Sequence, residues 1–345
     1  MSNRYFISYP SSEATNHFIK LLNNELKKGG WIESSDNVWR NIFLSIKNRK
    51  KNQIIYFHWP ETFWRHKSLI ISCLKSIVFI CHVVFWKIIG YKLVFSAHNV
   101  LPHYGKTHFK LELFMRRYII FTFDLVVGHS YNTFKDLIST VGYPRKYVLC
   151  LHGIYAQPQV PRLNTANIER KLFLPYSSHE YKGTETFLVQ FSSLNKDILT
   201  NIELVISGNV PNSIKKMLQH RAIRYKIIES ANGSYFLSEN ELRRVISICD
   251  MVVLPYKEIT NSGFFFMALT MGKGIIATDL PFFRLHGDAQ MQLLFDIESL
   301  KSLSEKIGLI NQGWIPNADI LKELQIKYSW AKSAKILAQK FNEIL

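Results

Sequence analysis

The chain has 345 residues, of which 47% are hydrophobic, 14% aromatic and 20% charged, and its formal net charge is +17. This composition is typical of a globular protein and excludes disordered and fibrous chains, while the length suits two domains. The four cysteines are scattered and form no CxxC pair, which argues against a disulfide framework and a zinc site. We also expect no secretory signal, because the first residues lack a basic segment followed by an apolar one.

The positive charge is concentrated in the N-terminal part of the chain. Residues 1–150 hold 21 Lys and Arg against 8 Asp and Glu, a net of +13, whereas the remainder holds 22 against 18, a net of +4. The N-terminal part therefore looks built to meet something anionic, with nucleic acid, an acidic lipid surface and a phosphate-bearing substrate as the candidates.

Short apolar runs alternate with helical patterns along residues 1–153. The segment after the first strand, residues 11–30, predicts a helix with Ser11 or Ser12 as its N-cap and two glycines at its end. Strands alternating with helices indicate a parallel sheet. The predicted strands are residues 4–10, 52–60, 91–99, 123–130 and 146–153.

Residues 68–90 form an apolar stretch about long enough to cross a bilayer, but Lys75, His82 and Lys87 interrupt it. Its polar residues recur at helical intervals and leave a broad apolar face. We expect a helix that is either buried in a domain or lies on a membrane with its lysines toward the lipid headgroups. Those lysines are Lys67, Lys75, Lys87 and Lys92.

A second alternating series follows residues 154–169, which are rich in Pro, Asn and Gln and form the best linker candidate. The chain thus contains two doubly wound α/β units. The strands predicted in the second unit begin at Arg170, Asn201, Met251 and Lys273, and the helices between them include residues 183–194, 239–250 and 262–272.

Polar clusters, including His58, His98, His129 and His152, stand at the carboxyl ends of these strands, where open parallel sheets bind ligands. Metal hydrolysis is disfavoured, because His98 and His103 are five residues apart and no carboxylate accompanies them at ligand spacing. The segment "GKT" at 105–107 lacks the earlier glycine of a phosphate loop. No GxGxxG occurs either.

An anion has better candidates in the second unit. Lys182 and Gly183 precede one helix, and Asn261, Ser262 and Gly263 open another, so a lysine and two helix N-termini could hold a diphosphate without metal. The plainer interpretations stay open. Lys182 is then a solvated lysine, and Ser262 with Gly263 a helix cap and turn.

These segments resemble the GT-B glycosyltransferases, in particular the large retaining family 4, over nearly the whole chain. "FLPYSSHEYKGTETFLVQFSSL", "LVISGN" and "ICDMVVLPYKEITNSGFFFMALTMGKGIIATD" are similar to that family's nucleotide-binding domain. "YFHWPE", "FSAHNVLPH" and "LCLHGIY" resemble the subgroup that builds bacterial surface polysaccharides, and "YSWAKSAKILAQKFNEIL" resembles the family's C-terminal helix.

The resemblance implies two Rossmann-like doubly wound domains that face a central cleft. It places an acceptor-binding domain at 1–155, a linker at 156–169, a nucleotide-sugar-binding domain at 170–327 and a C-terminal helix at 328–345 that packs back on the first domain. Its residue matches are His98, which contacts the donor sugar, and Lys182, which binds the donor diphosphate. The family's paired glutamates fall on Ile259 and Met267.

The departures from the family pattern suggest substitutes. Glu258 is the nearest carboxylate to the missing glutamates, an arginine usual before the lysine is absent, and His179, Ser262 and Gly263 are candidates to replace these contacts. The residues that we expect to bind the donor nucleotide-sugar are His152, Lys182, Gly183, Tyr256, Glu258, Asn261, Ser262 and Gly263.

The sequence therefore predicts a metal-independent hexosyltransferase that moves a sugar from a UDP- or GDP-sugar to a lipid-linked oligosaccharide in capsule, exopolysaccharide or O-antigen synthesis. His98 orients the sugar, His58 and Glu61 lie at the acceptor, and Glu61 is the candidate general base if the reaction inverts. Glu61 as a helix cap and His98 as a turn histidine remain the alternatives.

We expect no cofactor and no nucleic-acid partner, because no nucleic-acid-binding signature accompanies the basic charge. The protein is expected in the cytoplasm, peripheral on the anionic inner face of the cell membrane. The rival interpretation is a non-catalytic or degenerate GT-B protein that binds within a polysaccharide assembly.

Overall fold

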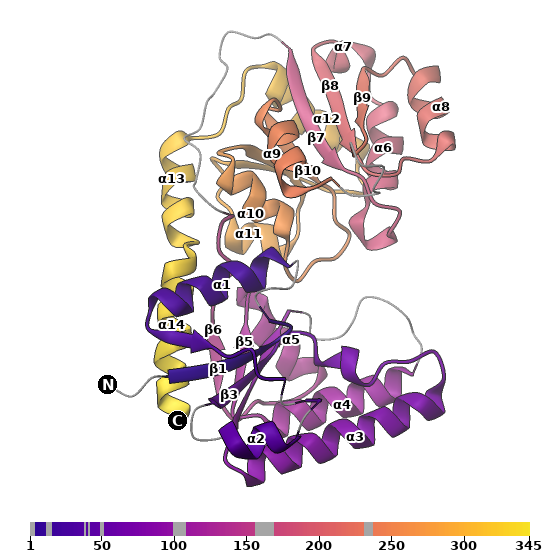
Figure 1. The fold of residues 1–345 in the computed structure, drawn as a ribbon. Helices are drawn as coiled ribbons and strands as arrows, with labels where there is room; N and C mark the ends of the chain where they lie inside the picture. Colours follow the sequence, from indigo (N-terminus) through magenta and orange to yellow (C-terminus); the bar gives the residue numbers. More distant parts are fainter. Residues whose placement is uncertain are drawn as a thin grey trace. The chain divides into compact units, whose positions relative to one another are not determined.

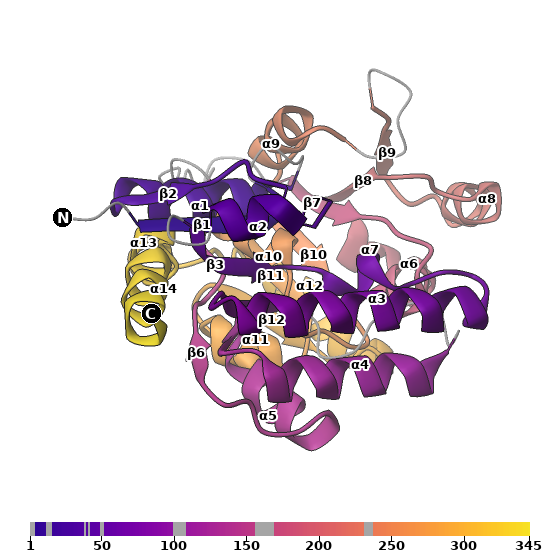
Figure 2. The ribbon, with the colours of Figure 1, turned by 60° about the horizontal axis from the view of Figure 1, so that its bottom comes forward.

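The computed structural model describes residues 4–11, 16–37, 39–40, 42–48, 52–98, 108–155, 169–230 and 237–345. The chain forms two compact units, one made of Met1–Gly153 and Tyr328–Leu345 and the other of Ile154–Lys327. Each unit holds one six-stranded parallel sheet with helices on its faces, so the predicted α/β class is confirmed (Figures 1 and 2). Residues 156–168 of the predicted linker lie outside the described residues.

The sheet of the first unit has the strand order β2-β1-β3-β4-β5-β6. Every neighbouring pair is parallel, and β1 is the strand from which the chain moves outward in both directions. The topological switch point of this unit therefore lies between β1 and β3, where a ligand site is expected. The strands are β1 (Arg4–Tyr9), β2 (Trp31–Glu33), β3 (Asn52–Phe57), β4 (Lys92–Ala97), β5 (Leu125–Gly128) and β6 (Tyr147–Leu149).

Alternate residues of these strands bury opposite faces of the sheet. Ile54 and Tyr56 pack against α1 (His17–Lys28) and the C-terminal helix α14 (Trp330–Ile344). Ile55 and Phe57 pack on the other face. The helices on that other face include α3 (Leu69–Ile88), α4 (Phe109–Thr122) and α5 (Tyr131–Thr140), and the unit also contains α2 (Ile42–Asn48) and the short 3-10 helix η1 (Pro60–Phe63).

The first helix begins later than the sequence predicts. Asn16, and neither Ser11 nor Ser12, is the N-cap of α1, with its side-chain oxygen accepting a hydrogen bond from the Phe18 N–H at 2.9 Å. Asn16 is an equally good cap chemically, and α1 from that start places Phe18 inside the core. The N-cap prediction was therefore wrong by several residues, and Ser12 lies outside the described residues.

The sheet of the second unit has the order β12-β11-β10-β7-β8-β9, again parallel throughout. In order of appearance this is 6-5-4-1-2-3, the arrangement of dinucleotide-binding folds, and its switch point lies between β7 and β10. The strands are β7 (Arg170–Pro175), β8 (Ile202–Ser207), β9 (Tyr225–Ile228), β10 (Met251–Leu254), β11 (Gly274–Thr278) and β12 (Gln292–Phe295).

The helices of the second unit follow its strands in the alternating order that the sequence predicts, beginning with those that border the switch point. The 3-10 helix η2 (Glu180–Lys182) and α6 (Thr184–Ser192) come after β7, and α10 (Gly263–Thr270) comes after β10. The other helices are α7 (Lys196–Leu199), α8 (Asn212–His220), α9 (Glu239–Ser247), α11 (Pro281–His286), α12 (Leu300–Asn311) and α13 (Ala318–Lys327).

Helix α3 buries one side and leaves a large apolar surface exposed. Ser72 and Ser76 are buried together with Phe79, Val83 and Trp86, and Ser76 donates its hydroxyl proton to the Ser72 carbonyl within the helix. The predicted burial in a domain is therefore confirmed for this side of the helix and not for its other apolar residues. The large apolar residues left exposed on α3 are Leu69, Ile70, Ile71, Leu74, Ile77, Val78, Val84 and Ile88.

Candidate functional site

The first cluster of candidate residues lies at the switch point of the second unit. Lys182 ends η2 after β7, and Tyr256 follows β10. The Lys182 ammonium donates to the Tyr256 hydroxyl at 3.1 Å and stands 4.3 Å from the centre of the Tyr256 ring and 5.1 Å from that of Tyr181. No carboxylate pairs with Lys182 within the described part of the chain, so this half-buried cation is held by aromatic groups that leave its charge uncompensated.

Tyr256 connects Lys182 to the start of α10. Its hydroxyl lies 3.0 Å from the Ser262 hydroxyl, and the Ser262 oxygen accepts a hydrogen bond from the Phe265 N–H at 3.2 Å. The Asn261 side-chain oxygen accepts from the Ser262 N–H at 2.9 Å. Both Tyr256 and Ser262 are almost fully buried, so the prediction that Ser262 caps this helix is confirmed, and the cap is rigidly linked to the lysine.

The N-terminus of α6 differs, because no side chain caps it. Gly183 precedes the helix with a φ of +63°, and a β-carbon there would lie 1.9 Å from the Pro255 carbonyl oxygen, so only glycine fits. Backbone N–H groups without a side-chain cap and a helix dipole thus stand at the start of α6, two residues after Lys182. This is the chemistry of an anion site.

Three other residues predicted for the donor site are Glu258, His179 and His152. Glu258 and His179 are exposed in the second unit, and the His179 ring lies 6.1 Å from that of Tyr181. His152 belongs to the first unit, where it is buried and its Nδ1 donates to the Gly153 carbonyl at 2.7 Å. The structure therefore places His152 in a different unit from Lys182.

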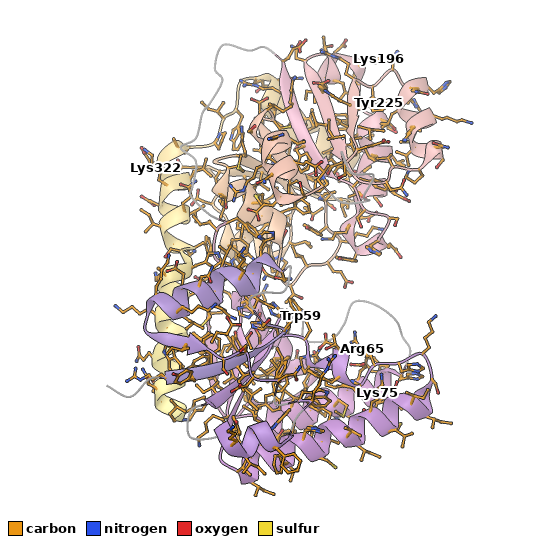
Figure 3. All side chains as sticks on the ribbon, in the orientation of Figure 1. Trp59, Arg65, Lys75, Lys196, Tyr225 and Lys322 are labelled. Carbon is orange, nitrogen blue, oxygen red and sulfur yellow. The ribbon has the colours of Figure 1, made fainter. Side chains whose placement is uncertain are left out.

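The second cluster of candidates, which we call the histidine cluster, lies at the carboxyl ends of the strands of the first unit and consists of His58, His98, His129 and His152. Their rings surround Phe18, whose centroid lies between 4.6 and 6.0 Å from each of theirs. Trp59 stacks on His98 at 4.5 Å, and Trp330 of α14 packs against Phe18 and His152 (Figure 3 labels Trp59).

Hydrogen bonds involve three members of this cluster, His58, His98 and His129. His58 Nδ1 lies 3.1 Å from His98 Nε2. His129 Nδ1 donates to the Cys150 carbonyl at 2.8 Å, so its Nε2 accepts the Ser96 hydroxyl proton at 2.5 Å. The Tyr56 hydroxyl in turn donates to the Ser96 oxygen at 3.2 Å.

Three imidazoles of the histidine cluster, those of His58, His98 and His129, are neutral near pH 7. Burial lowers the pKa of His58 and of His98 well below 6.5, and the neighbouring imidazoles lower both further. Burial also lowers the pKa of His129 to about 4, against a hydrogen bond to Cys150 that favours the charged form. These rings are therefore neutral hydrogen-bonding groups near pH 7.

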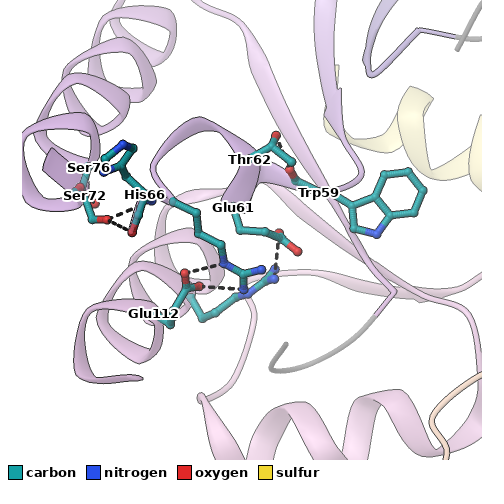
Figure 4. Close-up of polar contacts among 9 residues, drawn as sticks. Trp59, Glu61, Thr62, His66, Ser72, Ser76 and Glu112 are labelled. Atoms are coloured by element: carbon teal, nitrogen blue, oxygen red, sulfur yellow. Dashed lines mark hydrogen bonds and ion pairs between the residues drawn. The ribbon is translucent and has the colours of Figure 1, made fainter. Parts of the chain in front are cut away.

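Glu61, the candidate base, lies in a buried ion pair. One of its carboxylate oxygens is 2.8 Å from a guanidinium nitrogen of Arg116 (Figure 4). Arg116 belongs to α4, is 3% exposed and stands over the Phe95 ring. A second pair, Arg65 with Glu112, is bidentate at 2.6 and 3.2 Å. A base role for Glu61 stays a prediction, and its contact with Arg116 was not foreseen.

A polar hollow of about 340 Å³ opens where β1 ends. Asp36, which was not among the predicted residues, helps to line it, and Lys27 and Glu33 form a 2.9 Å ion pair at its side. It lies where β1 and β2 end, at the carboxyl edge of the sheet, which makes it the candidate site for a hydroxyl-rich group. The other residues of its lining are Ile7, Ser8, Tyr9, Ser11, Ser34, Ser35 and Asn37.

The described ranges contain no group of three or more His, Cys, Asp or Glu side chains arranged to hold a metal ion. His103 and the segment 105–107 lie outside the described residues. Two aromatic residues that complete the histidine cluster, Phe18 and Trp330, were missed, because their contacts join segments far apart in the sequence.

The topology and these strand-end clusters define the chain as a member of the GT-B class of folds. The solved sucrose-phosphate synthase of Thermosynechococcus elongatus superimposes with a TM-score of 0.70 at 12% identity, covering 99% of each chain. Anabaena HepE in complex with UDP and glucose gives 0.66 at 10% identity over 99% of this chain and 100% of its own. The lipopolysaccharide outer core galactosyltransferase WaaB gives 0.62 at 12% identity over 99% of each.

In sequence, the chain is similar to GDP-mannose:glycolipid 4-beta-D-mannosyltransferase from Xanthomonas campestris pv. campestris. The two are 25% identical over 244 residues, which are 68% of this chain and 64% of that protein. The chain thus spans less than two thirds of the length of the curated relative it matches. No family model matches the chain.

Proposed function

We propose that this protein is a glycosyltransferase that moves a hexose-type sugar from a nucleotide diphosphate sugar to a lipid-linked saccharide. The observation that carries the proposal is the uncompensated Lys182 ammonium beside the uncapped N-terminus of α6, at the switch point of a GT-B fold. A sugar transfer releases a nucleotide diphosphate, so fixed positive charge at this place stabilises the leaving group as its negative charge develops.

The donor is a UDP- or GDP-sugar in this proposal, and GDP-mannose is the first to test. The sequence relative is named for GDP-mannose, and a solved neighbour holds UDP and glucose. Lys182, Gly183 and Ser262 bind the diphosphate, with Tyr256 holding the lysine. The reaction needs no metal, because the lysine and backbone N–H groups supply the positive charge.

The first unit binds the acceptor, and His98 contacts a sugar hydroxyl. The hollow lined by Asp36 takes a saccharide hydroxyl group of the acceptor. Since the relative forms a beta linkage from GDP-mannose by its name, a reaction of that kind on an alpha-linked donor inverts the anomeric carbon and requires a general base. Glu61 is the candidate, with Arg116 holding its carboxylate in place.

Nucleotide binding tests the donor site. Thermal unfolding of the full chain is recorded with GDP, UDP and GDP-mannose, with EDTA present, for the wild type, Lys182→Met and Lys196→Met. Lys196 is an exposed lysine of α7 in the same unit, which makes it the matched control (Figure 3). We expect stabilisation by one nucleotide and a loss of about 10–100-fold in its affinity only in Lys182→Met.

One result would contradict the proposed donor site, and a second would show that the protein binds a nucleotide without transferring a sugar. If none of the nucleotides shifts the melting temperature, the donor site is wrong. If a nucleotide binds but no GDP or UDP is released when polyprenol-diphosphate-linked saccharides are added, the chain is a binding protein. The absence of carboxylates at Ile259 and Met267 makes that second outcome the rival function.

We also propose that the protein works at the inner face of the cytoplasmic membrane, with α3 and α4 against the lipid. Helix α3 is long and apolar enough to cross a membrane by composition, with 28% of its most apolar window buried. Its inward stripe, including Phe79, Val83 and Trp86, belongs to the core of the first unit. A helix anchored in this way lies on a membrane surface and does not span it.

Residues of α4 and nearby basic side chains extend the exposed surface of α3. Helix α4 runs beside α3 in both views and exposes Phe109, Phe114 and Phe121 (Figures 1 and 2). An exposed apolar area of this extent marks a membrane or protein interface. Lys75 lies exposed on α3, and Lys67, Lys110 and Arg117 are also exposed, whereas Lys87 is held by Asp124 at 2.7 Å and is not free for a headgroup (Figure 3).

Vesicle flotation tests the membrane proposal. The wild type is expected to float with vesicles of anionic phospholipid at moderate salt, and the triple variant Ile70→Asp, Leu74→Asp and Ile77→Asp to remain below. The control is Ile326→Asp, at a residue of α13 in the other unit that is 74% exposed. Failure of the wild type to float, or flotation of the triple variant, would refute the proposal.

A further inference from the structure

The contact between His58 and His98 is a hydrogen bond whose donor can be identified from the chemistry of the two rings. Both imidazoles are neutral near pH 7, because burial and neighbouring rings lower the pKa of each. A hydrogen bond between two neutral imidazoles needs a proton on one nitrogen and a lone pair on the other. The 3.1 Å contact between His58 Nδ1 and His98 Nε2 therefore has two possible directions, and each direction fixes the tautomer of both rings.

The second nitrogen of His58 decides between the two directions. His58 is 1% exposed, and its Nε2 is buried without a hydrogen-bond partner in the described part of the chain. If His98 donated, the His58 proton would sit on that Nε2, as a buried N–H with no acceptor. If His58 donates, only a lone pair is left unsatisfied, and buried orphan N–H groups are the rarer and more unfavourable case.

We propose that His58 is a positioning residue that donates from Nδ1 to His98 Nε2 and thereby holds His98 as its Nδ1–H tautomer. His98 then presents an N–H donor to a bound ligand, which selects an oxygen acceptor such as a sugar hydroxyl. In this state His98 is not a general base, because its one lone pair is already used. The identity of that oxygen as part of a donor sugar rests on the proposed function.

The surroundings of His98 fit this role. His98 is partly exposed as a residue, whereas His58 is 1% exposed, and His98 Nδ1 makes no further hydrogen bond to any described residue. Trp59 stacks on one face at 4.5 Å and Phe18 meets the ring edge-on at 4.6 Å. These contacts fix the plane of the ring, and the hydrogen bond from His58 fixes its proton.

Tautomers are read directly by nuclear magnetic resonance. The full chain is prepared with isotope-labelled histidine, and long-range proton–nitrogen correlation spectra at neutral pH distinguish Nδ1–H from Nε2–H rings. His98→Gln and His129→Gln assign the two signals by their disappearance. His129 serves as the internal reference, since its bond to the Cys150 carbonyl requires an Nδ1–H ring. We expect an Nδ1–H ring for His98 as well.

Two variants at residue 58 separate positioning from packing. His58→Asn keeps an N–H donor near the Nδ1 position, and we expect His98 to stay Nδ1–H. His58→Phe keeps a ring without a donor, and we expect the His98 signal to shift toward the Nε2–H form that neutral imidazoles favour in water, while His129 does not change. A wild-type His98 that is Nε2–H, or a His98 tautomer unaffected by His58→Phe, would overturn the proposal.

Activity is a separate readout. With the donor that the nucleotide screen identifies, His58→Phe should weaken transfer about tenfold and His58→Asn should recover most of that loss. If no donor is turned over but the spectra show the expected tautomers, the proposed function is wrong and the proposed hydrogen bond from His58 to His98 is supported. If turnover occurs but His98 is Nε2–H, the proposed hydrogen bond is wrong and the proposed function is supported. The wild-type spectrum alone decides the matter should His58→Phe not fold.

Discussion

Replacing Glu61 with glutamine should destabilise the first unit strongly, because the change leaves the Arg116 guanidinium buried without its counterion. The side chains of the pair are 3% and 11% exposed, and the two charged groups are 2.8 Å apart. Breaking a buried pair of this kind from one side costs about 3–5 kcal/mol of unfolding free energy. For a unit of this size that loss lowers the melting temperature by about 6–20 °C.

The assay is chemical denaturation of the purified full chain, followed by tryptophan fluorescence, beside thermal unfolding. The matched control is Glu25→Gln, which breaks the exposed pair between Glu25 and Lys28 in the same unit, where the lysine is 73% exposed. Exposed pairs contribute about 0–1 kcal/mol. Equal losses in Glu61→Gln and Glu25→Gln would refute the argument that burial makes the Glu61 pair different.

A double variant then separates the structural from the catalytic role of Glu61. Glu61→Gln with Arg116→Met leaves no stranded charge, so its loss of stability should be smaller than the sum of the two single losses. If Glu61 is the general base, the double variant regains stability without regaining transfer activity. Recovery of both would show that Glu61 acts only through the fold.

Three further predictions concern the two switch points. Gly183→Ala, with its φ of +63° and a backbone carbonyl oxygen 1.9 Å from the new β-carbon, should lower the unfolding free energy by about 1–3 kcal/mol, whereas Gly308→Ala, in open space inside a helix, should raise it by about 0.5–1 kcal/mol. A neutral Gly183→Ala in denaturant titrations would count against the tight approach. Ser262→Ala should lose about 1 kcal/mol of capping and also weaken nucleotide binding, while Ser299→Ala should lose only the cap, as calorimetry with and without nucleotide would show. The free energy of unfolding should fall as pH drops below about 6.5, because three histidines bind protons in the unfolded chain but stay neutral in the folded one. For His129 this difference persists down to about pH 4, its pKa in the folded chain. That dependence is about 1.4 kcal/mol per pH unit for each ring, and a melting temperature that does not change between pH 7 and pH 5 would contradict it.

Local patterns in the sequence were sufficient for the long, buried strands and for the helix starts of the second unit. The apolar runs around Ile55, Val94 and Val126 became β3, β4 and β5, because fully buried parallel strands are continuous in hydrophobicity. Lys182 and Gly183 precede α6, and Ser262 caps α10, since capping depends on a few neighbouring residues. These features needed no knowledge of distant contacts.

Three short strands at the ends of the sheets were missed. The strands β2, β9 and β12 have three or four residues each, whereas the equally short β6 was predicted because it lies within the longer apolar run 146–153. Each is a strand only because a longer neighbour pairs with it. The missed N-cap of α1 has a similar cause, because Ser11, Ser12 and Asn16 are all good caps and packing of Phe18 selects among them.

Helix α3 shows where hydrophobic periodicity was informative and where it was not. The pattern determined that a narrow polar stripe and a broad apolar face exist, but the sheet decided that Ser72 and Ser76 point inward. Ser76 bonds the Ser72 carbonyl of its own helix, whereas Ser72 donates to the His66 carbonyl before the helix. As a result, isoleucines of α3 are exposed at positions where polar side chains are usual, which the sequence could not reveal.

By itself, the sequence determined two doubly wound units, the strand ends that carry polar residues, and a lysine beside a helix start. Only the tertiary structure decided which of those strand ends meet. Strand order sets the switch points, and strand order depends on packing between segments that are far apart in the chain. The ring of histidines closes around Phe18 of α1 and Trp330 of α14 for the same reason, because long-range contacts of that kind leave no local periodicity to read.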